Sequence, residues 1–359
     1  MSKPHIWLRA ETKPQEQRTP LTPAGAQSLL DAGFSVTVED CPDRVFPIDA
    51  YRTVSCDIAQ PGTWTDAPDD AFVLGLKELP DDSFPLRHRH IYFAHVYKDQ
   101  AGAEATLGRF IRGGGLLYDL EYLTDDAGRR VAAFGYWAGF CGAALGVMAW
   151  GNKSAGDETP LHALVSLPSK DALLQAVSDS LGRFGARPGV MVIGAKGRSG
   201  SGAVELARLL GLDTIEWDLE ETRAGGPFDE INDADVFVNC VLVGSPMPPF
   251  VTTESLAQDG RRLSVISDVS CDPYGDYNPI PIYEHTTTFE NPCLEIIGGE
   301  NALHLIAIDH LPSLLPRESS EDYGAQLVPV LKTLGEAENG VWKRAIDVFI
   351  EKTRDFQVF

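Results

Sequence analysis

A glycine-rich turn between two strand-like segments constrains this chain more than any other feature. Residues 190–218 read VMVIGAKGRSGSGAVELARLLGLDTIEWD, in which the apolar run Val190–Ile193 leads into a turn with four glycines, one of them Gly197. A helix-periodic run follows, and a second apolar segment, Thr214–Trp217, ends at the acid Asp218. This order is typical of a dinucleotide site, because glycines let the backbone approach a pyrophosphate and the helix N-terminus offers free N–H groups to it.

The acid and the glycine spacing refine this prediction. An acid at the end of the second strand can bind a ribose 2′-hydroxyl, which favours NAD over NADP. The turn reads GxxGxxG instead of the strict GxGxxG pattern, so the spacing alone leaves open a βαβ unit that has a tight turn and no cofactor. The flanking strands and helix favour the cofactor site.

Length, charge and cysteine content bound the remaining possibilities. A chain of 359 residues suggests two domains with separate cores. The net charge of −22 disfavours nucleic acid as a partner, because phosphate contacts need clustered Lys and Arg. The six cysteines form no CxxC pair or zinc pattern, so we expect reduced thiols, no metal and a cytoplasmic location. No signal peptide or continuous apolar span is visible, so we expect no membrane partner.

Strand-like and helix-like segments alternate in both halves of the chain, which predicts an α/β protein with two Rossmann-like, doubly wound domains around a central cleft. We expect residues 1–133 and 320–359 to form a discontinuous, substrate-side domain. Residues 134–319 would form the NAD-binding domain, including an interdomain helix near residues 134–150. A single helix over Glu321–Lys352 would return the chain to the first domain.

Local signals place the individual elements. Thr22 is expected to cap a helix over Thr22–Ala32 that stops at Gly33, and a second helix is expected over Ala101–Arg112. His88 and His90 lie in a charged run and are expected to be solvated. The expected strands are His5–Arg9, Phe34–Glu39, Phe72–Lys77, Ile91–Ala94, Leu116–Asp119, Val190–Ile193, Thr214–Trp217, Val236–Asn239, Ser264–Asp268 and Leu305–Ile308.

Polar residues gather at the ends of the strands expected in the first half. In open α/β sheets, ligands bind beyond the carboxyl ends of the strands, so these residues would share one crevice. Lys77 beside other cations could act as a base, and His95 could move protons near neutral pH. The polar residues are Arg9, Glu11, Lys13, Glu16, Arg18, Lys77, Glu78, His95, Lys98, Asp99, Gln100, Asp119 and Glu121.

Longer motifs carry a resemblance to a known family. The segments LRAETKPQEQR, GLKELP, FAHVYKDQAG, LYDLEYL, GRRVAAFGYWAGFCGAALG, GPFDEI, NPIPIY and IDHLPSLLPRESS occur in this order from about Leu8 to Ser320. They resemble the NAD-dependent, L-lysine-forming saccharopine dehydrogenases of the alanine dehydrogenase/transhydrogenase-like superfamily. The turn departs from some relatives at Ser199, where they have a cysteine. The resemblance permits a monomer.

The resemblance implies a reaction in which L-saccharopine, NAD and water give L-lysine, 2-oxoglutarate and NADH. Lys77 of the GLKE motif would be the base, and His95 of the FAH motif would be the acid–base group for imine hydrolysis. Substrate contacts are implied at Arg18, Gln100, Arg130, Phe134, Ser270, Cys271 and Asp272. Groups that tune the pKa of the base and the acid are implied at Lys13, Glu16, Glu78, Lys98 and Glu121. Cofactor contacts are implied at Arg129, Gly197, Arg198, Asp218, Thr222, Cys240, Val269, Ile308, Asp309, His310 and Leu311.

Two alternatives stay open at this point. The chain could be a related opine or amino-acid dehydrogenase that uses a different amine and oxo acid, since small changes in a pocket can change the substrate. It could also be a non-catalytic NAD-binding protein, although the presence of both Lys77 and His95 disfavours this reading.

Overall fold

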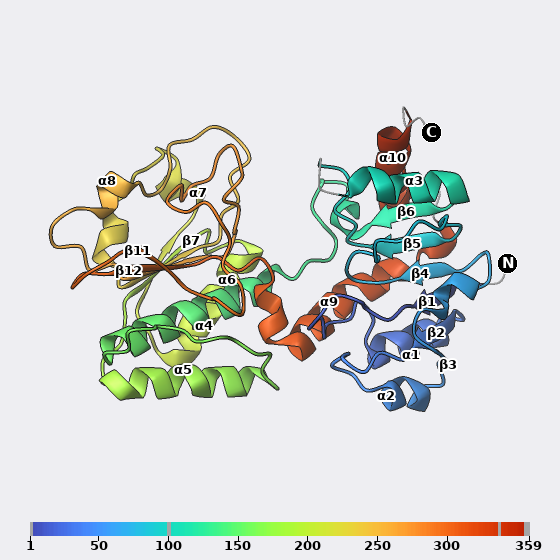
Figure 1. Ribbon diagram of the computed structural model, residues 1–359, viewed down its shortest axis with the longest axis horizontal. Helices are drawn as coiled ribbons and strands as arrows, with labels where there is room; N and C mark the ends of the chain where they lie inside the picture. Colours follow the sequence, from blue (N-terminus) through green and yellow to red (C-terminus); the bar gives the residue numbers. More distant parts are fainter. Residues whose placement is uncertain (1–2, 99–101, 337–338, 355–359) are drawn as a thin grey trace. The chain divides into compact units, whose positions relative to one another are not determined.

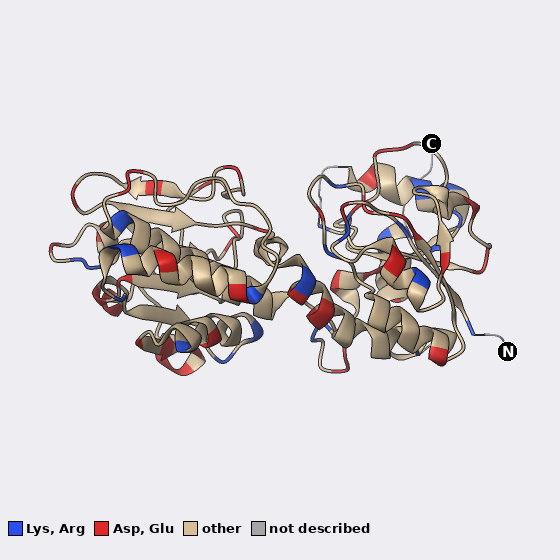
Figure 2. Ribbon diagram, turned by 90° about the horizontal axis from the view of Figure 1, so that it is seen from below, with Lys and Arg blue, Asp and Glu red and all other residues tan. Residues whose placement is uncertain are grey.

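The protein consists of two compact α/β units. The computed structural model describes residues 3–98, 102–336 and 339–354 (Figure 1). Unit 1 is Met1–Ala133 with Ser319–Phe359, and unit 2 is Phe134–Glu318. Acidic residues are spread over helices and loops of both units (Figure 2). None of the helices in the described ranges is long and apolar enough to cross a membrane.

Unit 1 is built on a six-stranded parallel sheet with the order β3-β2-β1-β4-β5-β6. The strand order reverses between β1 and β4, so the carboxyl ends of these two neighbours flank a switch point at which ligands bind in open α/β sheets. The strands are β1 (His5–Leu8), β2 (Ser35–Glu39), β3 (Asp57–Ala59), β4 (Phe72–Leu74), β5 (Arg89–Tyr92) and β6 (Leu116–Asp119). The helices are α1 (Pro23–Asp31), α2 (Ile48–Thr53), α3 (Ala103–Gly113) and α10 (Gly340–Thr353), with 3₁₀ turns η1 (Thr63–Asp66), η2 (Leu120–Tyr122) and η5 (Leu334–Glu336).

Unit 2 has a second six-stranded sheet, with the order β11-β12-β10-β9-β7-β8. All of its pairs are parallel except β11 with β12. The strands are β7 (Val190–Ile193), β8 (Thr214–Trp217), β9 (Val236–Asn239), β10 (Val265–Asp268), β11 (Leu294–Ile297) and β12 (Leu303–Ile306). The helices are α4 (Gly135–Ser154), α5 (Lys170–Phe184), α6 (Arg198–Leu210), α7 (Leu219–Thr222) and α8 (Thr253–Leu256), with η3 (Asp229–Asp233) and η4 (Leu311–Leu314); α9 (Pro316–Leu331) spans the division between the units.

The predicted α/β class with two doubly wound sheets is confirmed. Thr22 caps α1 as expected, because its hydroxyl accepts the N–H of Gly25 at 3.1 Å. The sequence analysis missed the edge strands β3 and β11. Neither carries the continuous apolar run of a buried parallel strand, and Leu294 and Glu295 of β11 are exposed.

Three local predictions are wrong. The single helix over Glu321–Lys352 is two helices, because α9 ends at Leu331 and α10 begins at Gly340, which adopts a positive φ of 60°. His90 is buried on β5, which lies between β4 and β6, and His88 is buried directly before that strand. Burial lowers the pKa of His90 well below its ordinary value. The strands expected at Ile91–Ala94 and Leu305–Ile308 each lie two residues earlier, at Arg89–Tyr92 and Leu303–Ile306.

The helix expected to cross between the domains packs inside unit 2. Helix α4 is buried along most of its length and packs against α5, α6, β9 and β10. Glycines allow the close approach of α4 to α6. A Cβ at Gly139 would overlap the carbonyl oxygen of Ser199, and one at Gly202 would overlap the carbonyl oxygen of Tyr136.

This packing predicts the effect of two alanine substitutions. Gly139→Ala should lower the free energy of unfolding by about 1–3 kcal/mol, because the added methyl group meets backbone that cannot move aside independently. Gly182→Ala is the matched control in α5, where a Cβ would have no neighbour within 4 Å. It should be neutral or stabilising by up to about 1 kcal/mol. Urea unfolding measures both, and equal midpoints for the two variants would contradict the packing argument.

Candidate functional site

The polar residues of unit 1 meet at the carboxyl edge of its sheet. Lys77 and Glu78 follow β4, His95 follows β5, and Asp119 ends β6. These strands are consecutive neighbours in the sheet and all run parallel. The sequence prediction that they share one edge is therefore realised in the fold, and the segment after β1 reaches the same edge beside β4.

His95 and Glu78 form the central pair of this edge. The His95 Nδ1 lies 2.5 Å from a Glu78 carboxylate oxygen, and the other Glu78 oxygen lies 3.3 Å from the Lys13 Nζ. His95 has a positive φ of 52°, an uncommon conformation for a residue with a Cβ. Its ring stacks on Phe93 with centroids 6.3 Å apart. The imidazole is thus held from two sides while its side chain stays 39% exposed.

The same pair sets the ionisation of both groups. The hydrogen bond to Glu78 raises the pKa of His95, although burial works in the opposite direction. Burial raises the pKa of Glu78, but the hydrogen bond with His95 and the nearby charges outweigh it and hold the pKa at about 2. Near neutral pH, Glu78 is therefore an anion that favours the imidazolium form of His95.

Asp119 connects the loops after β5 and β6. Its carboxylate accepts the N–H of Ala94 at 3.3 Å and the N–H of Glu121 at 2.9 Å. Burial raises the pKa of Asp119 to about 6. Glu121 pairs in turn with the Lys98 Nζ at 2.9 Å. Lys98 and Glu121, both predicted to tune the pKa of the base and the acid, therefore contact each other at this edge.

Arg18 and Glu16 form a two-pronged ion pair in the segment after β1. The Arg18 Nε and Nη2 donate to the two Glu16 oxygens at 2.8 and 2.6 Å, and both side chains are almost fully buried. Burial raises the pKa of Glu16, but the Arg18 guanidinium and the more distant Lys77 keep it below its ordinary value. The Arg18 guanidinium, which is predicted to hold a substrate carboxylate, is therefore already paired with a carboxylate of the protein.

Of the other residues predicted to contact the substrate, Arg130 belongs to unit 1 and Phe134 to unit 2. Arg129, predicted on the cofactor side, belongs to unit 1, where it is exposed and pairs with Asp125 at 2.9 Å. Arg130 forms an isolated bridge with Thr124. Phe134 is the N-cap of α4 in unit 2. Gln100 lies outside the described residues.

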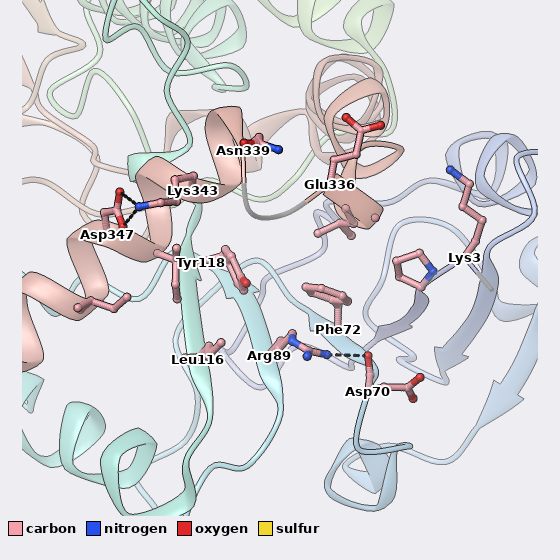
Figure 3. Close-up of a pocket in the computed structure, with 15 residues that line it drawn as sticks. Lys3, Asp70, Phe72, Arg89, Leu116, Tyr118, Glu336, Asn339, Lys343 and Asp347 are labelled. Carbon is pink, nitrogen blue, oxygen red and sulfur yellow. Dashed lines mark hydrogen bonds and ion pairs between the residues drawn. The ribbon is translucent and has the colours of Figure 1, made fainter. Parts of the chain in front are cut away.

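A cavity of about 940 Å³ opens at the opposite, amino-terminal edge of the unit 1 sheet (Figure 3). Asp70, Arg89 and residues of α10 line it. Two of its cations already have partners: Arg89 donates to the Asp70 carbonyl at 3.2 Å, and Lys343 pairs with Asp347 at 2.5 Å. None of the residues predicted for a site lines this cavity.

The glycine turn of unit 2 has the shape of an anion site. Gly194 adopts a positive φ of 86° directly after β7. A Cβ at Gly200 would overlap the Gly194 carbonyl, so the turn can be this tight only with glycine there. Gly197 is the N-cap of α6 and contributes no side-chain cap to its first N–H groups. These groups are the donors that a pyrophosphate would need.

Asp218 lies directly against this turn. Its carboxylate accepts the N–H of Lys196 and the N–H of Leu219, each at 2.8 Å. These backbone donors lower its pKa. The Thr222 hydroxyl donates to the Asp218 carbonyl at 2.9 Å. Asp218 is therefore an anion beside the glycine turn, which is the position that a ribose diol occupies in a Rossmann site.

Most of the other residues predicted on the cofactor side follow neighbouring strands of unit 2. Cys240 follows β9 and donates its N–H to Ile193 at 2.9 Å, while Val269 follows β10 and donates to Asn239 at 2.9 Å. His310 stacks on Phe289 with centroids 4.7 Å apart. The residues concerned are Arg198 at the start of α6, Cys240, Val269, and Ile308, Asp309, His310 and Leu311 after β12. Ser270, Cys271 and Asp272, which are predicted as substrate contacts, follow Val269 in the loop after β10.

The sequence analysis missed one hydrogen-bond network at the carboxyl edge of the unit 2 sheet. The buried carboxylate of Asp268 accepts the Tyr283 hydroxyl at 2.7 Å, the Asn239 amide at 2.9 Å and the Cys271 N–H at 3.3 Å. Cys271 has a positive φ of 50°. The available signal was an acid at the end of an apolar strand, the same pattern that drew attention to Asp119 and Asp218.

Comparison with known proteins places these features in context. Residues 7–141 match the family described as alanine dehydrogenase/PNT, N-terminal domain, and residues 228–350 match its C-terminal domain. The chain is 52% identical to a saccharopine dehydrogenase [NAD(+), L-lysine-forming] of Emericella nidulans, with 98% of each chain covered. It is 46% identical to the enzyme of the same name from Schizosaccharomyces pombe, over 96% of this chain and 97% of that one.

Solved structures with a similar fold agree with the family match. An L-alanine dehydrogenase matches with a TM-score of 0.68 and 16% identity, covering 98% of this chain and 100% of that chain. A transhydrogenase from Sinorhizobium meliloti matches with a TM-score of 0.64 and 16% identity, covering 95% and 97% of the two chains.

The Glu78–His95 pair predicts a pH-dependent contribution to stability. His95 has a pKa above 6.5 in the folded state, so its contribution is present below pH 6.5 and is lost as the pH rises through the folded value. Glu78 has a folded pKa of about 2 against 4.5 in the unfolded chain, so its contribution is lost as the pH falls from 4.5 toward 2. The wild type should exceed Glu78→Gln in stability most between these limits.

Urea unfolding over a pH series measures this difference. Glu205→Gln is the control, because its partner Arg208, 2.6 Å away on α6, has a pKa above its ordinary value and keeps its charge throughout. The stability difference for Glu205→Gln should stay level from about pH 5.5 to 8. A Glu78→Gln difference that is equally level would show that the pair does not set the titration of His95.

Proposed function

Because the chain belongs to the family of NAD-dependent, L-lysine-forming saccharopine dehydrogenases, we propose that it catalyses the reversible oxidative deamination of L-saccharopine to L-lysine and 2-oxoglutarate. The observation that carries this proposal is the sequence identity of 45–52%, over nearly the whole chain, to several relatives that bear this name. The resemblance inferred from the sequence motifs is confirmed at the level of the family.

NAD is the cofactor of this proposal, and the residues of unit 2 fit it. The N–H groups at the start of α6 would hold the pyrophosphate, and Asp218 would accept hydrogen bonds from the ribose. When bound, NAD supplies the acceptor for the hydride that leaves the substrate carbon. The protein has to position the substrate and to move protons.

Lys77 would take the proton from the secondary amine of saccharopine as the C–H bond is broken. Loss of this proton and of the hydride leaves a C=N double bond, to which a water molecule can add. Lys77 follows β4, the strand beside the switch point of unit 1, and its backbone is fixed by side chains of the segment after β1. A lysine amine on a fixed support is suited to this step.

His95 would handle the protons of the hydrolysis. It would remove a proton from the attacking water and return one to the nitrogen as the carbinolamine collapses to lysine and 2-oxoglutarate. A group that both removes and returns a proton has to change its charge near neutral pH, as an imidazole does. Glu78, 2.5 Å from its Nδ1, favours the protonated form and fixes which ring nitrogen faces the carboxylate.

Saccharopine carries three carboxylates. A protein of net charge −22 therefore needs cationic side chains at the site that binds it. Arg18 and Arg130 are the arginines that we assign to them, with Phe134, Gln100 and the loop Ser270–Asp272 as further contacts. Glu16 occupies the Arg18 fork at 2.6 and 2.8 Å. A substrate carboxylate would therefore share Arg18 with Glu16 or displace it, which makes Glu16 a competitor that tunes substrate affinity.

The reaction itself is the first test. Purified protein should oxidise NADH when both L-lysine and 2-oxoglutarate are present, with saccharopine as the product, and it should prefer NADH to NADPH because of Asp218. Omitting lysine, replacing it with ammonia or ornithine, or replacing 2-oxoglutarate with pyruvate should abolish the loss of NADH. Activity with one of those other pairs would identify a related dehydrogenase, and NADH binding without any turnover would identify a non-catalytic protein.

The role of Lys77 is tested by Lys77→Met. Removing a positioned general base should lower kcat by about 10²- to 10⁴-fold. Lys332→Met is the control, because Lys332 donates to Ser28 on α1, a helix that contributes no residue to the candidate site. Its kcat should match the wild type. Turnover of Lys77→Met near the wild-type rate across the pH range would exclude Lys77 as the base.

A further inference from the structure

Two side chains from the segment after β1 bind the backbone on either side of the Lys77 Cα. The Glu11 carboxylate accepts the N–H of Leu76 at 2.7 Å and the N–H of Lys77 at 3.0 Å. The Arg9 guanidinium donates to the carbonyl oxygen of Lys77. The carbonyl oxygen of Leu76 accepts the N–H of Phe93 at 3.1 Å. Every polar backbone group of Leu76 and Lys77 is thereby bonded.

The two side chains are buried and contact each other. Arg9 is 1% exposed and Glu11 5%, and the Arg9 Nη1 lies 3.5 Å from a Glu11 oxygen. The Arg9 guanidinium also lies 5.6 Å from the centre of the Tyr92 ring. A Cβ at position 75 would overlap the Arg9 guanidinium, so Gly75 lets this side chain pass beneath the loop.

Stability alone does not account for this arrangement. Desolvating two charges is costly, and apolar residues of the same shape often stabilise a protein core at least as well as a buried ion pair. The buried Nε of Arg9 has no hydrogen-bond partner among the described residues, which adds to the free-energy cost of burying the pair. What the charged pair supplies and an apolar pair cannot is a set of directional bonds to the Leu76–Lys77 backbone.

We propose that Arg9 and Glu11 are positioning residues that fix the backbone of Lys77, so that its amine reaches the reacting nitrogen in one direction. This inference rests on the proposed role of Lys77. Lysine has a long flexible side chain, so the direction of its Cα–Cβ bond decides which volume its amine can sample. A misplacement of about 1 Å can cost about 10²-fold in rate. The same support carries Glu78, which is the partner of His95.

The first test compares Glu11→Gln in two backgrounds. A glutamine keeps the shape but has one acceptor oxygen for two N–H donors. We expect kcat to fall about 10- to 100-fold while the KM for NADH stays within about twofold. In a Lys77→Met background, the loss of kcat from Glu11→Gln should be at least about threefold smaller than in the wild type, because the part that acts through the Lys77 amine is already gone and only the part that acts through Glu78 and His95 remains. Equal losses in both backgrounds would overturn the proposal.

A matched pair of arginine variants separates positioning from stability. Arg109 is another buried arginine of unit 1, and it donates to the carbonyl oxygens of Pro80 at 2.9 Å and Phe84 at 3.1 Å. Arg9→Lys and Arg109→Lys should both lower the urea midpoint, but only Arg9→Lys should lower kcat. Equal loss of kcat in the two variants would reduce the role of Arg9 to general stability.

Hydrogen exchange tests the Arg9–Glu11 clamp, meaning the bonds from these two side chains to the Leu76–Lys77 backbone. It does so in the wild-type protein, where no variant has to fold. The N–H groups of Gly75, Leu76 and Lys77 are bonded to Ile91 and Glu11. They should exchange at least about 100-fold more slowly than in an unstructured peptide. Exchange at the unstructured rate would refute the clamp even if Lys77→Met is inactive. Slow exchange together with a fully active Lys77→Met would instead refute the proposed base and leave the clamp in place.

Discussion

Both units depend on one kind of interaction, in which a side-chain carboxylate accepts hydrogen bonds from backbone N–H groups of a loop at the carboxyl edge of the sheet. Glu11 and Glu39 play this part in unit 1, with Asp119 beside them, and Asp218 and Asp268 do so in unit 2. Loops at such an edge have backbone donors with no partner in the sheet. Acceptors with a full negative charge satisfy them strongly and fix the conformation of the loops that carry the predicted chemistry.

Glu39 and Asp218 occupy the same place in their units, since each ends or directly follows the strand beside the first strand of its sheet. Glu39 is fully buried, and its carboxylate accepts the N–H groups of Ala10, Gly62 and Trp64. Asp218 is only partly buried and accepts two. The position that would bind a ribose in unit 1 is therefore saturated by the protein itself, which supports assigning the cofactor to unit 2.

The sequence predicted those features that a local pattern determines. The glycine turn, the Thr22 cap and the buried strands each follow from a few adjacent residues. The edge strand β11, the break before Gly340 and the burial of His90 depend on what packs against them, and no local pattern records that. The Arg9–Glu11 clamp is of the second kind, because its partners lie more than sixty residues along the chain, at Leu76 and Lys77.

The clamp also explains how two proton-transfer groups can stay in register. Glu78 follows Lys77 directly, and its carboxylate holds His95 in a left-handed conformation that is unfavourable for a histidine alone. Asp119 secures the other side of the same loop through the N–H of Ala94. A displacement of the Leu76–Glu78 backbone would therefore move the amine of Lys77 and release the imidazole of His95 together. The base and the acid are placed by one rigid support, so neither can be mispositioned alone.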